Sequence, residues 1–186
     1  MVTLPPGKSV VGCKWIYKIK TRLNGSIERY KAHLVEKGFT QEYGIDYEKT
    51  FTPVACISSI RALLAVATAS KWDLFQIDVK SAFLNGDLSE EVYMQPPPSL
   101  SVDSNKVCHL RRALYGLKQA PRAWFAKFSS TISRLGYMAS HYNSALFLRR
   151  TKKGTILLLM YMDDMILTSD DLSGIQELKN FLSQQF

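Results

Sequence analysis

The sequence predicts an α+β fold, in which layers of helices and strands are mixed, and three observations support this. Residues 10–20 alternate apolar and polar side chains, which is typical of a half-buried strand. Asn24 and Gly25 follow, and because both tolerate positive φ they predict a hairpin with a second strand over residues 27–35. Apolar residues at helical spacing recur in three later segments, so helices and strands must share a core. The inner face expected for the first strand consists of Val11, Cys13, Trp15, Tyr17 and Ile19.

Capping residues and apolar stripes place the three helices. The first is expected to begin at Ser58 or Ser59 and to run to about residue 70. Its inner stripe consists of Ile60, Leu63, Leu64 and Ala67. The second helix is expected over residues 121–135, because proline suits a first helical turn and Gly136 can end the helix. The third is expected to start near Asp170 or Ser173.

Short apolar runs predict the remaining strands. Residues 72–79 form one such run, which ends in Asp78. Residues 155–162 and 165–168 form two more, and Asp163 and Asp164 between them predict the tip of a tight hairpin. Residues 38–54 are rich in turn formers and predict a loop, while the prolines at 96–98 predict a rigid connector.

Composition excludes several classes of protein. The chain has 186 residues with 46% hydrophobic side chains, which is ordinary for a globular protein and too apolar for a disordered one. The three cysteines lie far apart, which argues against a disulfide framework or a zinc site. The N-terminal residues lack an apolar signal core, and the longest apolar run is too short to cross a bilayer. We therefore expect an intracellular protein without membrane contact, in the cytoplasm or the nucleus.

Charge is unevenly distributed along the chain. Lysine and arginine outnumber aspartate and glutamate by 24 to 16, a net charge of +8, which favours an anionic partner such as nucleic acid. Residues 1–40 carry a net charge of +6 and residues 105–135 a net charge of +7, whereas residues 41–104 carry −5. Two basic blocks around an acidic one suggest a cleft that holds phosphates against a metal centre, although solvated surface lysines would give a similar pattern.

Three carboxylates are the candidate metal ligands. Asp163 and Asp164 lie between apolar segments, and two like charges beside a buried core repel unless a cation lies between them. Asp78 ends another apolar strand, and carboxylates on neighbouring strands can converge on two Mg²⁺ ions. The set offers only hard oxygen ligands, which suit magnesium. Alternatively, the adjacent pair simply forms a turn.

Several motifs together resemble one family. Residues 77–86 read Ile-Asp-Val-Lys-Ser-Ala-Phe-Leu-Asn-Gly, residues 113–124 read Ala-Leu-Tyr-Gly-Leu-Lys-Gln-Ala-Pro-Arg-Ala-Trp, and residues 161–164 read Tyr-Met-Asp-Asp. Gly-Cys-Lys-Trp at 12–15 and Gly-Ile-Asp-Tyr at 44–47 complete the set. In this order they resemble the reverse transcriptase of Ty1/copia-type LTR retrotransposons, from about residue 5 to the end of the chain.

The resemblance implies a right-hand polymerase fold made of fingers and palm, with the thumb missing. It places fingers at residues 1–75 and a palm strand at 76–95. Residues 96–120 would form a fingers connector. Residues 121–186 would form the palm helix, the hairpin of Tyr-Met-Asp-Asp and the following helix, truncated before the thumb.

The resemblance also implies roles for individual residues. Asp78, Asp163 and Asp164 would be the catalytic carboxylates that bind two Mg²⁺ ions, for which Mn²⁺ could substitute, and Val79 would add its carbonyl oxygen. Nucleotide contacts would come from Phe83, which would exclude a ribose 2′-hydroxyl, from Tyr115 and Gly116, and from Lys31 or Arg29. Nucleic-acid contacts would come from Lys118, Arg122, Lys127, Tyr161 and Met162. The chain departs from the family at His33, where arginine is usual.

The function implied is RNA-directed DNA polymerisation, in which nucleotides from dNTPs are added to the 3′-hydroxyl of a primer on an RNA or DNA template. The RNase H and integrase regions of such polyproteins are absent from this sequence, and virus-like particles in the cytoplasm are an expected location. One alternative is a truncated, inactive remnant that only binds nucleic acid. A second is an interaction domain whose acidic turns are incidental.

Overall fold

The computed structural model describes residues 1–103 and 105–186, and these form two compact units. Unit one consists of Met1–Thr50 and Gly86–Ala123, and unit two consists of Phe51–Asn85 and Trp124–Phe186. Residue 104, within the predicted connector 96–120, lies outside the described residues. The structure contains both helices and sheets, as the α+β prediction requires. The boundaries of the two units differ from those of the predicted fingers and palm segments, and the assignment of fingers and palm stays a prediction.

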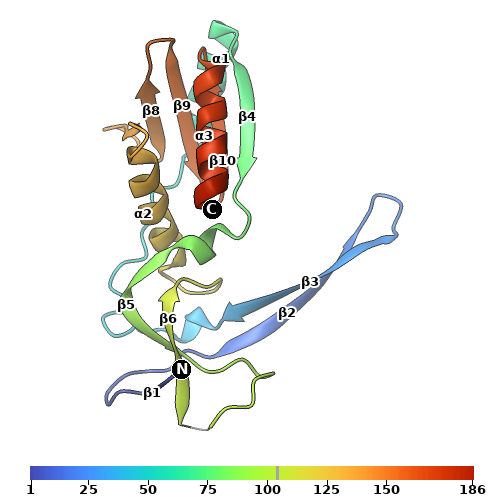
Figure 1. Cartoon of the computed structure of the whole chain (residues 1–186), viewed down its shortest axis with the longest axis vertical. Helices are drawn as coiled ribbons and strands as arrows, with labels where there is room; N and C mark the ends of the chain where they lie inside the picture. Colours follow the sequence, from blue (N-terminus) through green and yellow to red (C-terminus); the bar gives the residue numbers. More distant parts are fainter. Residues whose placement is uncertain (104) are drawn as a thin grey trace. The chain divides into compact units, whose positions relative to one another are not determined.

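Unit one contains a small sheet and a long hairpin. In the sheet, β6 (Lys106–Arg112) lies between β1 (Val2–Thr3) and β5 (Asp87–Met94), and both pairings are antiparallel. The hairpin pairs β2 (Cys13–Thr21) with β3 (Ile27–Glu36) around the predicted turn, as Figure 1 shows. Val11, just before β2, forms a parallel bridge with Met94, so the base of the hairpin is tied to β5.

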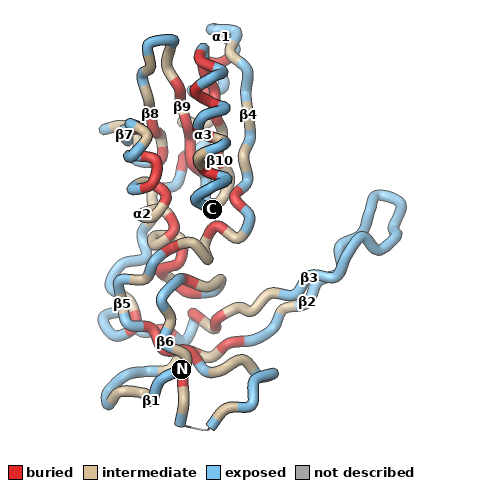
Figure 2. The backbone as a smooth tube through the Cα atoms, viewed as in Figure 1, coloured by how far each residue is buried: buried red, intermediate tan, exposed pale blue. Residues whose placement is uncertain are grey.

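Most of the hairpin is exposed, which corrects one expectation. Val11 and Cys13 are buried as predicted, but Tyr17 is 74% exposed and Ile19 is 59% exposed. Figure 2 shows that the exposed colour continues along both strands away from the base. The alternation of side chains is therefore real, but it gives two exposed faces rather than one buried face.

Unit two is built on an antiparallel five-stranded sheet. Its strands are ordered β4 (Asp73–Asp78), β10 (Asp164–Ser169), β9 (Thr155–Tyr161), β8 (Leu146–Arg150) and β7 (Met138–Ala139). Alternate residues of the central strands point to opposite faces, and both faces are apolar. This explains why the sequence shows continuous apolar runs here instead of alternation.

Helices cover both faces of this sheet. The larger core joins α2 (Ala120–Ser133) and α3 (Leu172–Gln185), through residues such as Phe128 and Leu178, to Leu158 and Leu167 of the sheet. Figure 1 shows these two helices in front of the strands. On the opposite face, Leu63 of α1 (Ile57–Ser70) packs near Leu159. Each fully buried leucine of this kind stabilises the fold by roughly 1.5–3 kcal/mol.

The helices begin close to the predicted residues, with small corrections. The cap of α1 is Cys56 rather than a serine, and Leu64 of its predicted inner stripe is 39% exposed. The cap of α3 is Asp171, whose carboxylate accepts a hydrogen bond from the backbone N–H of Gly174 at 3.0 Å. Hydrogen bonds from the hydroxyls of Ser173 and Thr151, together with this backbone bond, lower the pKa of Asp171 to about 2.

Two short 3-10 helices complete the fold, η1 (Gly38–Thr40) in the predicted loop and η2 (Ala82–Asn85) after β4. The predicted palm strand 76–95 is divided by η2 between the end of β4 and β5. The strands β1, β6, β7 and β8 were not predicted, because their sequences are too short or do not alternate clearly. Within the part of the chain that the structure describes, no helix is both long and apolar enough to span a membrane.

Glu36 is an unusual buried charge at the base of the hairpin. Its side chain is 3% exposed, and neither carboxylate oxygen has a hydrogen-bond partner among the described residues. Cys13 lies opposite it on β2. Burial raises the pKa of Glu36 from 4.5 to about 8, so the folded protein holds this carboxyl in its neutral form at neutral pH.

We expect Glu36 to make the protein less stable as the pH rises. The unfolded chain releases this proton near its ordinary pKa of 4.5 and the folded chain only near 8, so the free energy of unfolding falls between these values and levels off above them. Glu36→Gln should remove that fall and be more stable than the natural protein in alkaline buffer. Urea titrations across this pH range measure the effect, with the exposed residue Glu28 changed to Gln as control. Parallel pH profiles for the natural chain and Glu36→Gln would contradict the assignment.

Candidate active site

Two of the three predicted carboxylates face each other across neighbouring strands. Asp164, the first residue of β10, is the register partner of Asp78, the last residue of β4. Directly opposite residues of an antiparallel pair point to the same face, with Cβ atoms roughly 4.5–5.5 Å apart. Two like charges at this spacing repel, and a divalent cation between them would remove the repulsion. Tyr161 is the partner of Asp164 on β9, so the row continues across a third strand.

The third carboxylate lies in the turn that joins β9 to β10. The sequence predicted Asp163 and Asp164 as the hairpin tip, whereas Met162 and Asp163 form the turn and Asp164 already belongs to β10. Met162 has φ of 59°, a left-handed conformation that is strained for a residue other than glycine. Two hydrogen bonds hold this turn: the indole of Trp124 donates to the Met162 carbonyl at 3.2 Å, and the N–H of Val79 donates to the Asp163 carbonyl at 3.3 Å.

Gln76 and Trp124 are neighbours of the site that the sequence analysis did not identify. The amide of Gln76 donates to Oδ1 of Asp164 at 3.2 Å and so orients that carboxylate. Gln76 precedes Asp78 by two residues on β4, and strand alternation alone would have placed it on the same face. Trp124 lies within the predicted helix 121–135, and nothing in the sequence indicated that its N–H group would bond to the turn.

The donor set is consistent with magnesium, but the structure does not show a complete site. Among the described residues, no group of three or more histidine, cysteine, aspartate or glutamate side chains is placed to hold a metal ion. Asp78 and Asp164 are brought together by the strand register, while Asp163 lies in the turn beside them. The carbonyl of Val79, predicted as a further ligand, accepts a hydrogen bond from the N–H of Ala82 at 3.2 Å.

The predicted nucleotide-binding residues are divided between the two units. Phe83 lies in η2 of unit two, is half-buried and packs against the larger core. Tyr115 and Gly116 belong to unit one, where the ring of His33 meets that of Tyr115 edge-on at 5.8 Å between centroids. Gly116 has φ of 101°, and a Cβ atom there would collide with the carbonyl oxygen of Glu36, so only glycine fits.

Lys31 and Arg29 lie on one basic face of the exposed hairpin. On β2 and β3, Lys18 is the register partner of Lys31 and Lys20 is the partner of Arg29. Like charges directly opposite one another destabilise a strand pair unless an anion neutralises them. This face is therefore suited to a polyanion.

Lys118 and Arg122, predicted to contact nucleic acid, make contacts inside unit one. The ammonium of Lys118 donates to the Gln41 carbonyl at 3.0 Å and lies over the ring of Tyr47, 4.9 Å from its centroid. The guanidinium of Arg122 pairs with Glu90 at 3.4 Å. Both cations thus have structural partners, and their role toward a template stays a prediction.

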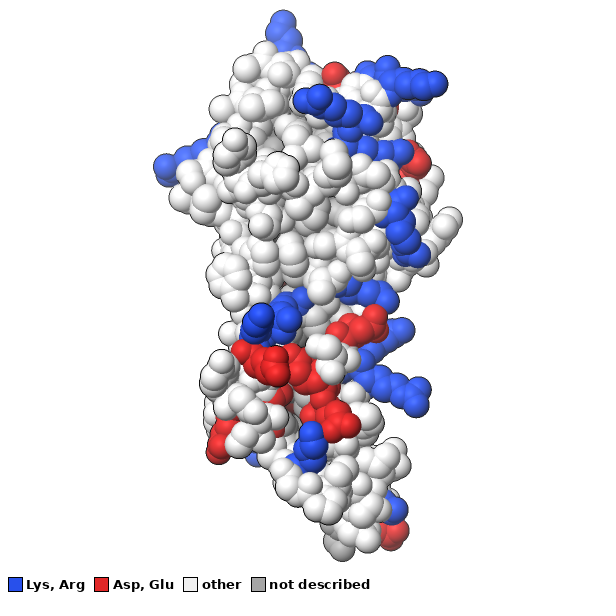
Figure 3. All heavy atoms as spheres, turned by 90° about the vertical axis from the view of Figure 1, so that its left-hand side faces the viewer, with Lys and Arg blue, Asp and Glu red and all other residues white. Residues whose placement is uncertain are grey.

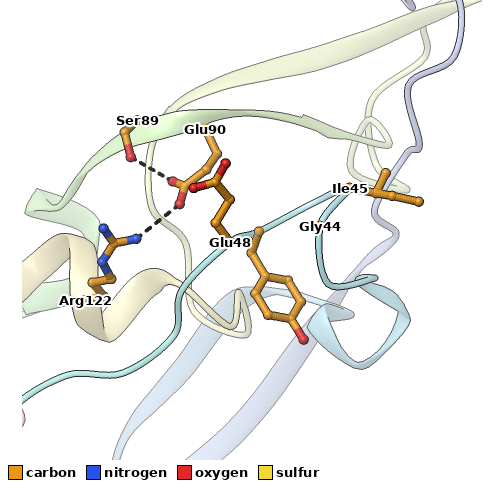
Figure 4. Close-up of a pocket in the computed structure, with 7 residues that line it drawn as sticks. Gly44, Ile45, Glu48, Ser89, Glu90 and Arg122 are labelled. Carbon is orange, nitrogen blue, oxygen red and sulfur yellow. Dashed lines mark hydrogen bonds and ion pairs between the residues drawn. The ribbon is translucent and has the colours of Figure 1, made fainter.

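A polar pocket of about 350 Å³ surrounds this ion pair in unit one. Figure 4 shows the Glu48 and Glu90 carboxylates close together, with Arg122 and Ser89 bonded to Glu90. Figure 3 shows that acidic side chains gather on one face, bordered by lysine and arginine. Of the nine acids in residues 41–104, only Asp73 and Asp78 belong to unit two, so most of this acidic segment belongs to unit one.

The remaining predicted nucleic-acid contacts lie in unit two. Lys127 is half-buried on α2. Tyr161 is 43% exposed and Met162 is 46% exposed at the end of the β9–β10 hairpin, beside the candidate metal ligands. Their positions allow contact with a ligand that approaches Asp163.

Comparison with known proteins decides the family. A profile described as "Reverse transcriptase (RNA-dependent DNA polymerase)" matches residues 1–186, the whole chain. The chain belongs to this family. The reverse transcriptase region is 43% identical over 185 residues to the "Retrovirus-related Pol polyprotein from transposon RE2" of Arabidopsis thaliana, covering 98% of this chain and 13% of that protein.

Two further relatives agree with this assignment. The "Retrovirus-related Pol polyprotein from transposon TNT 1-94" of Nicotiana tabacum is 42% identical over 189 residues, which is 100% of this chain and 14% of the relative. The "Transposon Ty1-ER2 Gag-Pol polyprotein" of Saccharomyces cerevisiae is 29% identical over 163 residues, 84% of this chain and 9% of the relative. The predicted Ty1/copia-type reverse transcriptase is thereby confirmed, and the chain spans a small part of each of these polyproteins.

We expect removal of one carboxylate to stabilise the protein in the absence of divalent ions. Asp164→Asn relieves the repulsion from Asp78, worth roughly 0.2–1 kcal/mol, so the melting temperature should rise by at most about 4 °C. Adding Mg²⁺ should raise the melting temperature of the natural chain and leave that of Asp164→Asn almost unchanged, because the binding pair is gone. Thermal unfolding with and without Mg²⁺ measures both effects.

Asp73→Asn is the matched control, since Asp73 lies at the other end of β4 and its register partner is Ser169. It should respond to Mg²⁺ as the natural chain does. An equal Mg²⁺ response in all three proteins would show that the ion binds elsewhere.

Proposed function

We propose that this region catalyses RNA-directed DNA polymerisation, adding nucleotides from dNTPs to the 3′-hydroxyl of a primer paired with an RNA or DNA template. The observation that carries the proposal is the pairing of Asp78 with Asp164 across β4 and β10, beside the turn that contains Asp163. Membership of the reverse transcriptase family supports it.

Asp78, Asp163 and Asp164 would hold two Mg²⁺ ions, with Val79 adding its carbonyl oxygen. Carboxylate oxygens suit hard divalent ions, so Mn²⁺ would substitute. When bound, the ions would stabilise the negative charge that develops on the phosphoryl group and its leaving group.

The protein's own residues would position these ligands. Gln76 holds the Asp164 carboxylate through its amide, and Trp124 fixes the strained turn of Met162 and Asp163 through its indole N–H. Both contacts come from the protein itself, so they restrict the positions open to the Asp164 carboxylate and to the turn. Phe83 is assigned to exclusion of a ribose 2′-hydroxyl by its place in the family motif, and its packing against the core supplies a rigid support.

The hairpin β2–β3 would bind phosphate groups: Lys31 or Arg29 those of the nucleotide, and the basic face as a whole those of the nucleic-acid backbone. The facing pairs Lys18–Lys31 and Lys20–Arg29 place four positive charges on one face of the hairpin. The opposite face includes Tyr17, Ile19 and Tyr30, which are between 59% and 76% exposed. Basic and aromatic side chains on one exposed ribbon suit a nucleic acid, whose phosphates and bases need these two kinds of contact.

Removing two of these charges should weaken nucleic-acid binding in a salt-dependent way. For the double variant Lys18→Gln, Lys31→Gln, the slope of log K against log salt concentration should become less steep. The expected change on duplex nucleic acid is roughly 0.9 for each phosphate that the variant no longer neutralises. Fluorescence anisotropy with a labelled RNA–DNA duplex at several salt concentrations measures the slope.

The matched control removes two charges elsewhere, at the exposed turn between β8 and β9, in the double variant Lys152→Gln, Lys153→Gln. Its slope should stay that of the natural chain. If both double variants make the slope less steep to the same extent, binding depends only on the net charge of the protein, and the hairpin is not the binding face.

Primer extension tests the proposed activity directly. The chain is incubated with a poly(rA)/oligo(dT) template, dTTP and Mg²⁺, beside an Asp163→Asn variant. Extension should occur and should fall at least about a hundredfold in the variant, because a ligand for the reacting centre is removed. Extension that persists in Asp163→Asn would come from another activity.

No extension by a folded chain that binds the duplex would favour the alternative of an inactive remnant that only binds nucleic acid.

The RNase H and integrase regions of a Pol polyprotein are proposed as further partners, because the names of the relatives describe polyproteins.

A further inference from the structure

Two glutamine side chains form a buried amide pair in unit one. Gln41 is 4% exposed and Gln119 is 1% exposed. The side-chain amide of Gln41 donates to Oε1 of Gln119 at 3.0 Å, and the amide of Gln119 donates to the Asp46 carbonyl at 3.1 Å. Buried amides are costly unless bonded, so this pair fixes the relative position of the two segments that carry it.

Gln41 also holds the residue next to its partner. Oε1 of Gln41 accepts a hydrogen bond from the backbone N–H of Lys118 at 2.9 Å. The backbone carbonyl of Gln41 accepts another from the Lys118 ammonium at 3.0 Å. One side chain therefore contacts both Lys118 and Gln119, at the end of the turn that begins with Tyr115 and Gly116.

Backbone contacts hold the other end of this turn. The N–H of Glu36 donates to the Tyr115 carbonyl at 2.8 Å. Gly38 and Gly116 approach so closely that a Cβ atom on Gly38 would collide with the Gly116 carbonyl, and a Cβ atom on Gly116 would collide with the backbone of Glu36. Residues 36–41 thus contact both ends of the turn 115–119: their backbone contacts Tyr115 and Gly116, and the Gln41 side chain contacts Lys118 and Gln119.

We propose that Gln41, together with Gln119, is a positioning residue for the incoming nucleotide: the amide pair sets the shape of the turn 115–119 that contacts it. This inference rests on the proposed function, which assigns Tyr115 and Gly116 to the nucleotide pocket. Apolar residues of similar size would fill the same space, but they would leave the N–H of Lys118 and the carbonyl of Asp46 without their present partners. The polar pair therefore specifies one conformation of the turn.

Gln41→Leu and Gln119→Leu test the positioning role, singly and together. Each single variant should raise KM for dTTP between roughly tenfold and a hundredfold, with little change in the affinity for the primer–template duplex. Because the two amides act as one unit, the double variant should be no worse than the more affected single variant. Gln176→Leu is the matched control, since Gln176 is an exposed glutamine whose amide bonds only to Asn180 among the described residues; it should leave KM unchanged.

A second variant keeps the proposal testable where leucine disturbs folding. Gln41→Glu preserves shape and the acceptor for Lys118, but an ionised carboxylate cannot donate to Gln119. Burial should raise the pKa of the new carboxyl, so its KM for dTTP, divided by that of the natural chain, should rise from neutral to alkaline pH as this carboxyl ionises. A flat ratio, or equal reductions in nucleotide and duplex binding in all the variants, would overturn the proposal.

Hydrogen exchange separates this inference from the proposed function. The backbone amide of Lys118 should exchange faster in Gln41→Leu than in Gln176→Leu, because its acceptor is gone. One outcome is that the natural chain extends no primer while the Lys118 amide exchanges faster in Gln41→Leu. In that case the amide pair does hold the turn 115–119, and the polymerase proposal for this chain fails. If extension occurs and neither the exchange of Lys118 nor KM changes in Gln41→Leu, the proposed positioning role of Gln41 is wrong.

Discussion

The pairing of β4 with β10 is the constraint on which the candidate active site depends. Strand register has a period of two residues, so a slip by one residue would turn one carboxylate to the opposite face of the sheet. Met165 and Leu167 of β10 alternate with Asp164 along the strand, and they are buried against α2 and α3 on the opposite face of the sheet from the carboxylates. The hydrophobic core of unit two thus determines that Asp78 and Asp164 meet, at a cost in charge repulsion that a cation would offset.

The two units achieve rigidity by different physical means. Unit two depends on apolar packing on both faces of its sheet, with Leu158 and Leu159 on adjacent positions of β9 buried in opposite cores. Around the turn 115–119, unit one depends on directional contacts: a buried amide pair, close glycine contacts and backbone hydrogen bonds. Apolar packing tolerates many sequences of similar volume, whereas hydrogen-bonded amides accept few replacements.

The sequence was sufficient for the features that have strong local signals. The Asn24–Gly25 turn, the three helices and the apolar strands beside Asp78 and Asp164 are found close to where they were predicted. The pairing of Asp78 with Asp164 needed a long-range register that no local pattern contains. Burial of Glu36 and the contacts of Lys118 were not predictable either, because both residue types are usually exposed and their neighbours here are distant in sequence.

The exposed hairpin has a consequence for how the molecule opens. A two-stranded ribbon without a covered face is at best marginally stable, and here the contacts with the rest of unit one lie toward its base, at Val11, Glu36 and the ring of His33. Its outer part can therefore separate transiently while the sheets and helices stay intact. A protease that cuts after lysine or arginine should nick the tip of this ribbon first, leaving a folded body held together by the contacts on either side of the cut.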